Sequence, residues 1–416
     1  MRLRRTGPAL ALALVASCLA LTATAAHAEE PTCVRGTPAA GTQPTEGDPS
    51  DDVDPTLVAL RLDEVHRIAT GAGVGIAVID SGIAASPSLR LGEGRDFASG
   101  SIVDGHGTVV AGLISGAAPA TGIAPGATLY DVRVVSGRPG DGAAPTGANP
   151  DVVAAAVRWA IANRDQPIDV IHLSVGFAEP HAGLADAIRE AVAAGLVVVA
   201  PAGDRPATVP GGGALEGQGT GSEAEAGPPA APDDVLFPAS MPEVLAVTAR
   251  DAELAMSTSA LLLGPGVDVS APVVGMRSVM LAGLPCRVDV PTSTWAAASV
   301  SGLVALLLEQ DPSLTPAQVR TRIAVTAQGG LADVATDGHG MVQPLEALTR
   351  VLDIAADGTL DTTRSTGSSE YVAATPQAPD GGHAGRGGPL LWWALGAGGV
   401  LVLALVLRPV LAGRRA

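Results

Sequence analysis

Short runs of mainly apolar residues recur along the middle of this chain, and their spacing restricts the folds open to it. Four such runs cover residues 74–79, 170–173, 196–199 and 244–247. Continuous apolar runs of this length are typical of β-strands that are covered on both faces. Helical patterns follow at residues 151–163, 181–194, 296–309, 315–327 and 344–355. Strands that alternate with helices predict a three-layer α/β domain over residues 54–355, with a central parallel sheet.

The first 28 residues have the features of a signal peptide. Three arginines open the segment, an apolar run follows, and Ala26-His27-Ala28 forms a small-x-small cleavage site. Val15-Ala16-Ser17-Cys18 also resembles a lipoprotein box, which would place a lipid on Cys18. We favour an incidental cysteine, because a second membrane anchor follows near the other end of the chain. Residues 29–53 are then an N-terminal extension of the exported protein.

Residues 389–412 are predicted to form a single transmembrane helix. No charged residue occurs from Pro389 to Leu407, a length that just crosses the hydrocarbon core of a bilayer. Arginines follow this run, and arginine marks the cytoplasmic end of a membrane span. We therefore expect a cell-membrane protein with its main domain outside and residues 413–416 inside. Residues 356–388 are rich in Asp, Thr, Ser, Pro and Gly, which predicts a flexible stalk.

The charge of the chain limits its partners. The formal net charge is −17, and removal of the three leader arginines makes it −20. Nucleic-acid phosphates need Lys and Arg to neutralise them, so we expect no nucleic-acid partner. No acidic loop of the kind that holds Ca²⁺ stands out, and we expect neither a metal nor a cofactor.

Two cysteines remain after the leader, Cys33 in the extension and Cys286 in the main domain. A pair of cysteines in an exported protein predicts a disulfide, here between Cys33 and Cys286. The alternative is two free thiols.

Two polar motifs could carry chemistry. Asp80 follows the first apolar run in Ile79-Asp80-Ser81-Gly82, and His106 lies in Asp104-Gly105-His106-Gly107-Thr108. Catalytic groups of a parallel α/β sheet collect at the carboxyl ends of the strands. A histidine can serve there as general base and acid, while an aspartate fixes its tautomer and stabilises the imidazolium. Each residue alone would also fit a structural role, as a turn residue or a helix-start residue.

Together these motifs resemble those of the subtilases, the subtilisin-like serine peptidases. The similarity continues in the same order over about 300 residues, through Gly122–Ala127, Leu173–Gly176, Phe237–Ser240 and Val267–Pro272. The leader, the cysteine-bearing extension and the C-terminal span narrow it to the mycosins, membrane-anchored subtilases of type VII secretion. The resemblance implies a subtilisin-like three-layer fold and serine-type endopeptidase chemistry. It also implies a polypeptide substrate and secretion-apparatus membrane components as partners.

The nucleophile position departs from the family pattern. Subtilases carry G-T-S-x-A-x-P-x-V-x-G there, and alignment on Val300-Ser301-Gly302 puts Thr294 in place of the serine. The preceding Gly becomes Thr292 and the Pro becomes Ala298. Ser293 is the alternative nucleophile, but its use needs a one-residue slip that turns the side chain by about 100° around the helix. We favour Thr294.

The oxyanion position departs as well. The family uses the Asn of a Gly-Asn pair, and this chain has Gly203-Asp204. A carboxylate has no N–H to donate to a developing oxyanion. By resemblance, Ser174, Val175, Gly176 and Gly203 line the substrate cleft. Two functions stay open: a cell-surface endopeptidase that uses Asp80, His106 and Thr294, and a catalytically impaired pseudoprotease that acts as a scaffold or binds peptides in a secretion complex.

The predicted topology can be tested on intact cells. Because the main domain is expected outside, an added protease should release a soluble fragment of about residues 29–388 into the medium. Immunoblotting of medium and membranes would detect it. Protection of the main domain until the membrane is permeabilised would contradict the predicted orientation.

Overall fold

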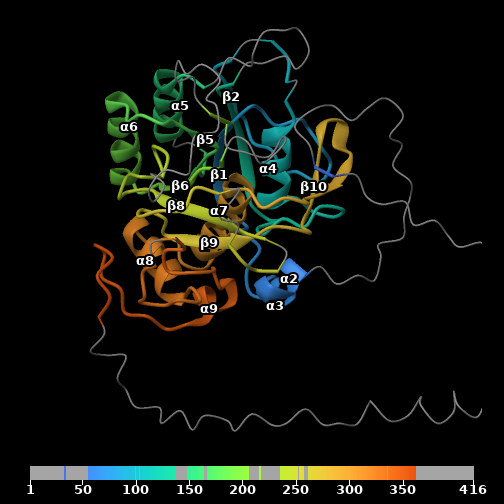
Figure 1. Cartoon of the computed structure of the whole chain (residues 1–416). Helices are drawn as coiled ribbons and strands as arrows, with labels where there is room; N and C mark the ends of the chain where they lie inside the picture. Colours follow the sequence, from blue (N-terminus) through green and yellow to red (C-terminus); the bar gives the residue numbers. More distant parts are fainter. Residues whose placement is uncertain are drawn as a thin grey trace, which may run out of the picture. The chain divides into compact units, whose positions relative to one another are not determined.

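The computed structural model of the chain describes residues 32–33, 55–98, 100–102, 104–135, 148–163, 166–205, 215–216, 235–251, 253–256, 261–334 and 336–361 (Figure 1). Its strands are β1 (Gly75–Asp80), β2 (Arg95–Asp96), β3 (Thr128–Arg133), β4 (Val170–Leu173), β5 (Val175–Gly176), β6 (Val197–Pro201), β7 (Leu215–Glu216), β8 (Leu245–Arg250), β9 (Val269–Pro272), β10 (Arg277–Val279) and β11 (Pro285–Arg287). Its α-helices are α2 (Pro55–Leu60), α3 (Leu62–Val65), α4 (His106–Ser115), α5 (Pro150–Ala162), α6 (Ala182–Ala193), α7 (Ser293–Gln310), α8 (Pro316–Thr326) and α9 (Pro344–Thr349).

Seven strands form the central sheet in the order β2-β3-β1-β4-β6-β8-β9. Every neighbouring pair in this sheet is parallel. Helices α5 and α6 lie on one side of the sheet, and α4 and α7 lie on the other (Figure 1). The expected three-layer α/β fold with a parallel sheet is therefore confirmed.

The side chains of β1 show how one sheet supplies two cores. Ile76 and Val78 belong to the apolar cluster formed with α4 and α7. Ala77 and Ile79 belong to the cluster formed with α5 and α6. Side chains alternate between the faces of a strand, so a strand with helices on both sides favours apolar residues at successive positions. This is the physical reason for the uninterrupted apolar runs.

Local sequence fixes where several helices begin. Thr315 and Gln318 form a capping box at α8, in which each side chain accepts a hydrogen bond from the backbone N–H of the other residue. The Asn149 side chain caps α5 by accepting from the N–H of Asp151 at 2.8 Å. Pro150 and Pro316 occupy first helical positions, where no N–H is needed.

Some elements differ from the sequence-based expectation. Helix α4 was not expected, because its sequence contains glycines and β-branched residues that weaken a helical pattern. Its ten residues are all buried, so packing outweighs propensity there. Helix α9 ends at Thr349 instead of extending to 355. Residues 356–361 also bond to α8, since Thr321 Oγ1 donates to the Gly358 carbonyl at 2.8 Å. The folded domain thus continues beyond its expected end at residue 355 into the predicted stalk.

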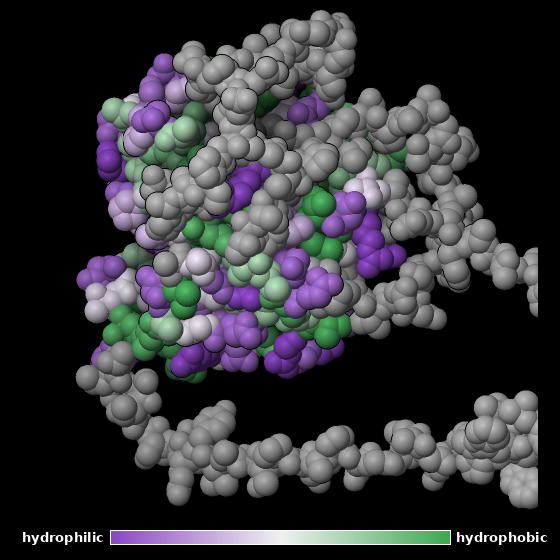
Figure 2. All heavy atoms as spheres, in the orientation of Figure 1, coloured by the Kyte–Doolittle hydropathy of each residue, from purple (hydrophilic) through white to green (hydrophobic). Residues whose placement is uncertain are grey.

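The remaining sequence predictions about the ends of the chain fall outside the described residues. These are the leader at 1–28, most of the extension at 29–53, the span at 389–412 and the tail at 413–416. Among the described residues, no helix is long and apolar enough to cross a membrane. Figure 2 shows hydrophilic residues interspersed with hydrophobic ones on the described surface of this view.

Cys33 and Cys286 form a disulfide that spans 253 residues of sequence. Cys286 lies in β11 and is completely buried, and Cys33 is nearly so. The backbone supports the link, because the N–H of Cys33 donates to the carbonyl of Arg287 at 2.9 Å. The disulfide therefore ties the N-terminal extension to the β10–β11 hairpin.

Loss of this disulfide should destabilise the domain. We expect the double substitution Cys33→Ser, Cys286→Ser to lower the free energy of unfolding by about 2–5 kcal/mol, because the unfolded chain loses a long-range constraint. Urea unfolding of the oxidised parent and the variant would measure it. The reduced parent is the matched control and should resemble the variant. Alkylation of both cysteines in the parent without reductant would contradict the disulfide.

Candidate active site

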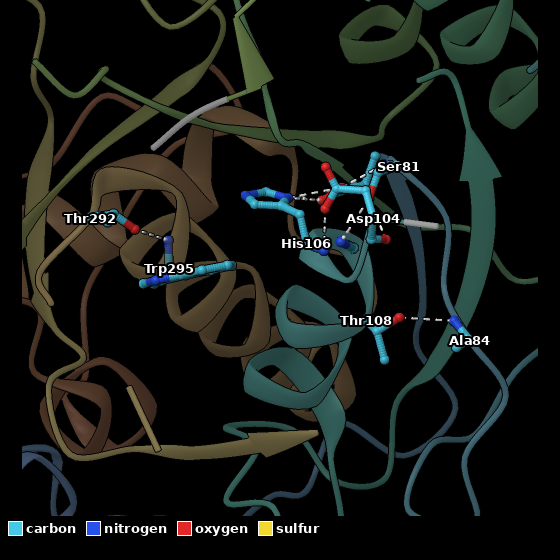
Figure 3. Close-up of polar contacts among 9 residues, drawn as sticks. Ser81, Ala84, Asp104, His106, Thr108, Thr292 and Trp295 are labelled. Atoms are coloured by element: carbon cyan, nitrogen blue, oxygen red, sulfur yellow. Dashed lines mark hydrogen bonds and ion pairs between the residues drawn. The ribbon is translucent and has the colours of Figure 1, made fainter. Parts of the chain in front are cut away.

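Two adjacent elements bring the predicted acid and base together. Asp80 is the last residue of β1, and His106 is the first residue of α4. Asp104 fixes the start of α4 by accepting the N–H of His106 at 2.9 Å. Ser81 links the two segments, since its hydroxyl donates to the Asp104 carbonyl at 3.2 Å and accepts the N–H of Gly107 at 3.1 Å. Figure 3 shows this arrangement.

The imidazole of His106 is bound by the Asp80 carboxylate. His106 Nδ1 lies 2.9 Å from Oδ1 and 3.0 Å from Oδ2 of Asp80, and both side chains are completely buried. A carboxylate can only accept, so Nδ1 carries the proton and Nε2 is left as the basic atom. Burial acts to raise the pKa of Asp80, but the hydrogen bond from His106, together with the positive charge of this histidine when it is protonated, outweighs burial and holds that pKa below its usual range. The pair has the hydrogen-bond geometry of an aspartate that orients a histidine base.

Gly107 is needed for the close approach of β1 and α4. A Cβ atom at this position would lie 2.6 Å from the Gly82 carbonyl oxygen and 3.0 Å from the Asp80 carboxyl group. Any side chain would therefore displace the aspartate from the histidine. Gly82 itself has a φ of 108°, a conformation that favours glycine.

The predicted nucleophile segment forms the start of α7. Thr292 is its N-cap residue, and Ser293 and Thr294 are the first two helical residues. All three are completely buried. Thr294 Oγ1 and His106 Nε2 are both without a hydrogen-bond partner within the described structure. The threonine hydroxyl and the base thus do not form the hydrogen bond that activates a nucleophile.

Ser293, the alternative nucleophile, is held by Gly203 and Asp204. Its hydroxyl accepts the N–H of Gly203 at 3.2 Å. Its own N–H donates to Oδ1 of Asp204 at 2.7 Å. Asp204 is 5% exposed, so its carboxyl group lies in the protein interior at the N-terminus of α7. An acidic group there is favoured by the helix dipole.

The residues predicted to line the substrate cleft are buried in this structure. Ser174 and Val175 have no exposed surface, and Val175 and Gly176 form β5. Ser174 is close enough to help lower the pKa of Asp80, although its hydroxyl has no partner at hydrogen-bond distance. Gly203 contributes its N–H to Ser293, as described above.

Two site residues were missed by the sequence analysis. His172 in β4 is completely buried, and its Nδ1 lies 2.9 Å from the hydroxyl of Ser301. Burial lowers the pKa of His172 to about 4, so it stays neutral at pH 7. Trp295 in α7 stacks on His106, with 4.8 Å between ring centroids. An aromatic residue next to the nucleophile position was the only available signal for Trp295, and His172 lay inside an apolar run.

No group of three or more His, Cys, Asp or Glu side chains in the described part of the chain could hold a metal ion. A cavity of about 430 Å³ lies elsewhere, between α3 and the β10–β11 hairpin, and Arg61, Arg277 and Arg287 line it.

A parallel three-layer fold with an Asp–His pair at the carboxyl end of an interior strand, near the start of a buried helix, defines the subtilisin-like class. The subtilase family pattern matches residues 71–341. This chain therefore belongs to the subtilase family of serine peptidases.

Within the family the chain resembles the mycosins. It is 31% identical over 336 residues to Mycosin-1 of Mycobacterium tuberculosis, which covers 70% of this chain and 72% of that protein. The serine protease MycP1, an essential component of the type VII (ESX-1) secretion system, has a similar structure, with 28% identity and a TM-score of 0.58 over 78% of this chain and 93% of that one. A chain of an intact ESX-5 inner membrane complex shares the fold at 24% identity, with a TM-score of 0.59 over 92% and 94% of the two chains.

Asp131 is a second carboxyl group beside the Asp–His pair. It lies in β3, next to β1, and its Oδ1 is buried without a hydrogen-bond partner within the described structure. Burial, reinforced by the charge of Asp80, raises the pKa of Asp131 from 3.8 to about 6. The folded protein therefore holds this proton more tightly than the unfolded chain, so ionisation opposes folding.

The substitution Asp131→Asn should stabilise the protein at neutral pH. The penalty is absent below about pH 4, grows as the pH rises toward 6, and is complete above 6. At 1.36 kcal/mol per pKa unit its upper limit is about 3 kcal/mol, and we expect a gain of about 1–3 kcal/mol at pH 7. Urea unfolding at pH 4 and pH 7 would measure it. Asp186→Asn on the exposed face of α6 is the control, and an equal gain at both pH values would rule the explanation out.

Proposed function

We propose that this chain is a mycosin-like subtilase whose peptidase site is strongly impaired and which serves as a folded component of a type VII secretion membrane complex. One observation carries the proposal. The hydrogen bond between Asp80 and His106 is present, but no hydroxyl group is hydrogen-bonded to His106 Nε2 within the described structure.

The oxyanion side supports the same conclusion. Asp204 Oδ1 accepts the first N–H of α7, where the family has an amide that can also donate. Loss of one oxyanion donor lowers a hydrolysis rate by roughly 10²–10³. A carboxylate in that place also repels the negative charge that develops on the substrate oxygen. Threonine at position 294 adds a β-methyl group that restricts its χ1 rotation. Both departures act against the same transition state.

The secretion role is supported by the relatives and by the predicted ends of the chain. MycP1 is a component of a type VII secretion system, and the ESX-5 chain belongs to an inner membrane complex. A signal peptide at 1–28 and a membrane helix at 389–412 would place this domain on the outer side of the same membrane. Membrane components of the secretion system are then its partners.

A serine-type endopeptidase that uses Asp80, His106 and Thr294 is the second candidate. The intact Asp–His pair favours it, because a folded scaffold alone has no need of a buried carboxylate with a lowered pKa. On this view the hydroxyl of Thr294 reaches His106 only when a peptide is bound, since catalytic hydrogen bonds often form only in the substrate complex. A polypeptide is the substrate in this case.

Repair of the site should distinguish the two candidates. In an impaired enzyme, the double substitution Asp204→Asn, Thr294→Ser restores an oxyanion donor and a primary alcohol. We expect peptide or ester hydrolysis to rise about 10²-fold above the parent, and each single change to give less because the groups act as a unit. Labelling by a fluorophosphonate probe would report the new serine directly.

The matched control carries the same chemical changes at exposed positions, Asp186→Asn with Thr349→Ser. Addition of His106→Ala to the repaired variant should abolish the gain. Rapid labelling of the unmodified chain, lost in Ser293→Ala but kept in Thr294→Ala, would overturn both the impaired site and the choice of Thr294.

A further inference from the structure

The indole ring of Trp295 covers the base of the site. Trp295 is the third residue of α7, and its ring stacks on the imidazole of His106 at a centroid distance of 4.8 Å and an angle of 26°. Figure 3 shows the two side chains extending toward each other from α7 and α4. Trp295 is 1% exposed and His106 has no exposed surface. The structure therefore describes a closed site.

The start of α7 fixes the backbone of Trp295. Thr292 Oγ1 accepts the N–H of Trp295 at 3.2 Å, which is an N-cap hydrogen bond to the third helical residue. Ser293 is held by Asp204 in the same turn. Only rotation about the side-chain bonds of Trp295 is then needed to move the indole, while the backbone can stay in place.

The imidazole of His106 has no surface exposed to solvent. Asp80 occupies Nδ1, the indole covers one ring face, and Nε2 is buried. A peptide or a reagent must contact Nε2 or its surroundings to react. Because no surface of His106 is exposed, such contact requires part of the protein to move, and Trp295 is the side chain in direct ring contact.

The closed position also has a cost. Trp295 Nε1 is buried and has no hydrogen-bond acceptor within the described structure. An unpaired buried donor is unfavourable, and only stacking and burial of the ring offset it. A peptide carbonyl that enters the site could accept this N–H, so an extended polypeptide is the ligand that favours the open position.

From these contacts we propose that Trp295 is the positioning residue that controls access to His106, and that polypeptides reach the base only when the indole leaves the imidazole. This inference depends on the proposed function in one respect, which is that His106 is taken as the base of the site. It concerns accessibility and does not require that the site hydrolyse anything.

Carbethoxylation by diethyl pyrocarbonate tests the inference, because the reagent modifies accessible neutral imidazoles. The full chain would be treated briefly, and modification of each histidine quantified by peptide mass spectrometry. His181, whose side chain is 35% exposed, is the internal reference. In the parent we expect His106 to remain almost unmodified. In Trp295→Ala its rate relative to His181 should rise at least about tenfold, because reaction no longer waits for a local opening.

Three further variants separate access from general loosening. Trp295→Phe keeps an aromatic ring and should retain most of the protection. Trp295→Leu keeps apolar volume without a stacking ring and should expose His106. This variant also provides the test if the alanine variant fails to fold. Trp159→Leu, in α5, is the control for loss of a tryptophan and should change nothing. His172, buried in the sheet, should stay unmodified throughout.

Two results would overturn the inference. One is modification of His106 in the parent at the rate of His181. The other is unchanged protection of His106 in folded Trp295→Ala and Trp295→Leu. The outcome is independent of hydrolysis, so Trp295 can control access whether or not the Asp204→Asn, Thr294→Ser variant gains activity. Conversely, failure of the access experiment leaves the impaired-site proposal standing on Asp204 and Thr294.

Discussion

The hydrogen bond between Asp80 and His106 joins strand β1 of the central sheet to helix α4, and the surrounding contacts keep it in place. Asp104 and Ser81 hold the start of α4 against the end of β1. Gly107 allows an approach that no other residue permits. Both partners are completely buried, in a place where an unpaired charge would be very unfavourable. The geometry proposed for the acid–base half of the site is therefore present together with its supporting contacts.

The start of α7, which holds the predicted nucleophile Thr294, is not arranged for catalysis in the same way as the Asp80–His106 pair. The first turn of α7 is occupied by contacts within the protein: Asp204 takes one N–H, Thr292 takes another, and Trp295 covers the imidazole. Each contact stabilises the helix start or the closed site. A subtilase that binds substrate uses this region to receive a peptide carbonyl. The same donors cannot serve both purposes, so stability of the closed form and hydrolysis compete here.

The sequence predicted the fold and indicated that Asp80 and His106 belong together, because both features leave strong patterns. A strand covered on both faces favours apolar residues throughout, and the Gly–His–Gly motif reflects a close backbone approach. Helix α4 was missed because burial overrides weak propensity. His172 was missed because a neutral, hydrogen-bonded histidine inside a sheet resembles any other core residue in sequence. The contact between Trp295 and His106 depends on how α7 is placed relative to α4. The spacing of residues in a single sequence carries no information about that placement. The lack of an oxyanion donor at Asp204 was predicted from the chemistry of a carboxylate. Its hydrogen bond with the N–H of Ser293 is seen only in the structure.

The crowding of Asp204, Thr292 and Trp295 into one helical turn has an evolutionary consequence. Groups that act on one transition state are strongly non-additive, so reversal of one substitution gains little while the others remain. Reversal of Thr292 to glycine would also remove the hydroxyl oxygen that accepts the N–H of Trp295 and caps the start of α7. If the site is impaired as we propose, a lineage with this set of residues must pass through less stable, still inactive intermediates on a path back to an efficient enzyme. Loss of catalysis would then be difficult to reverse, and natural selection would act on the shape and the binding surfaces of the domain.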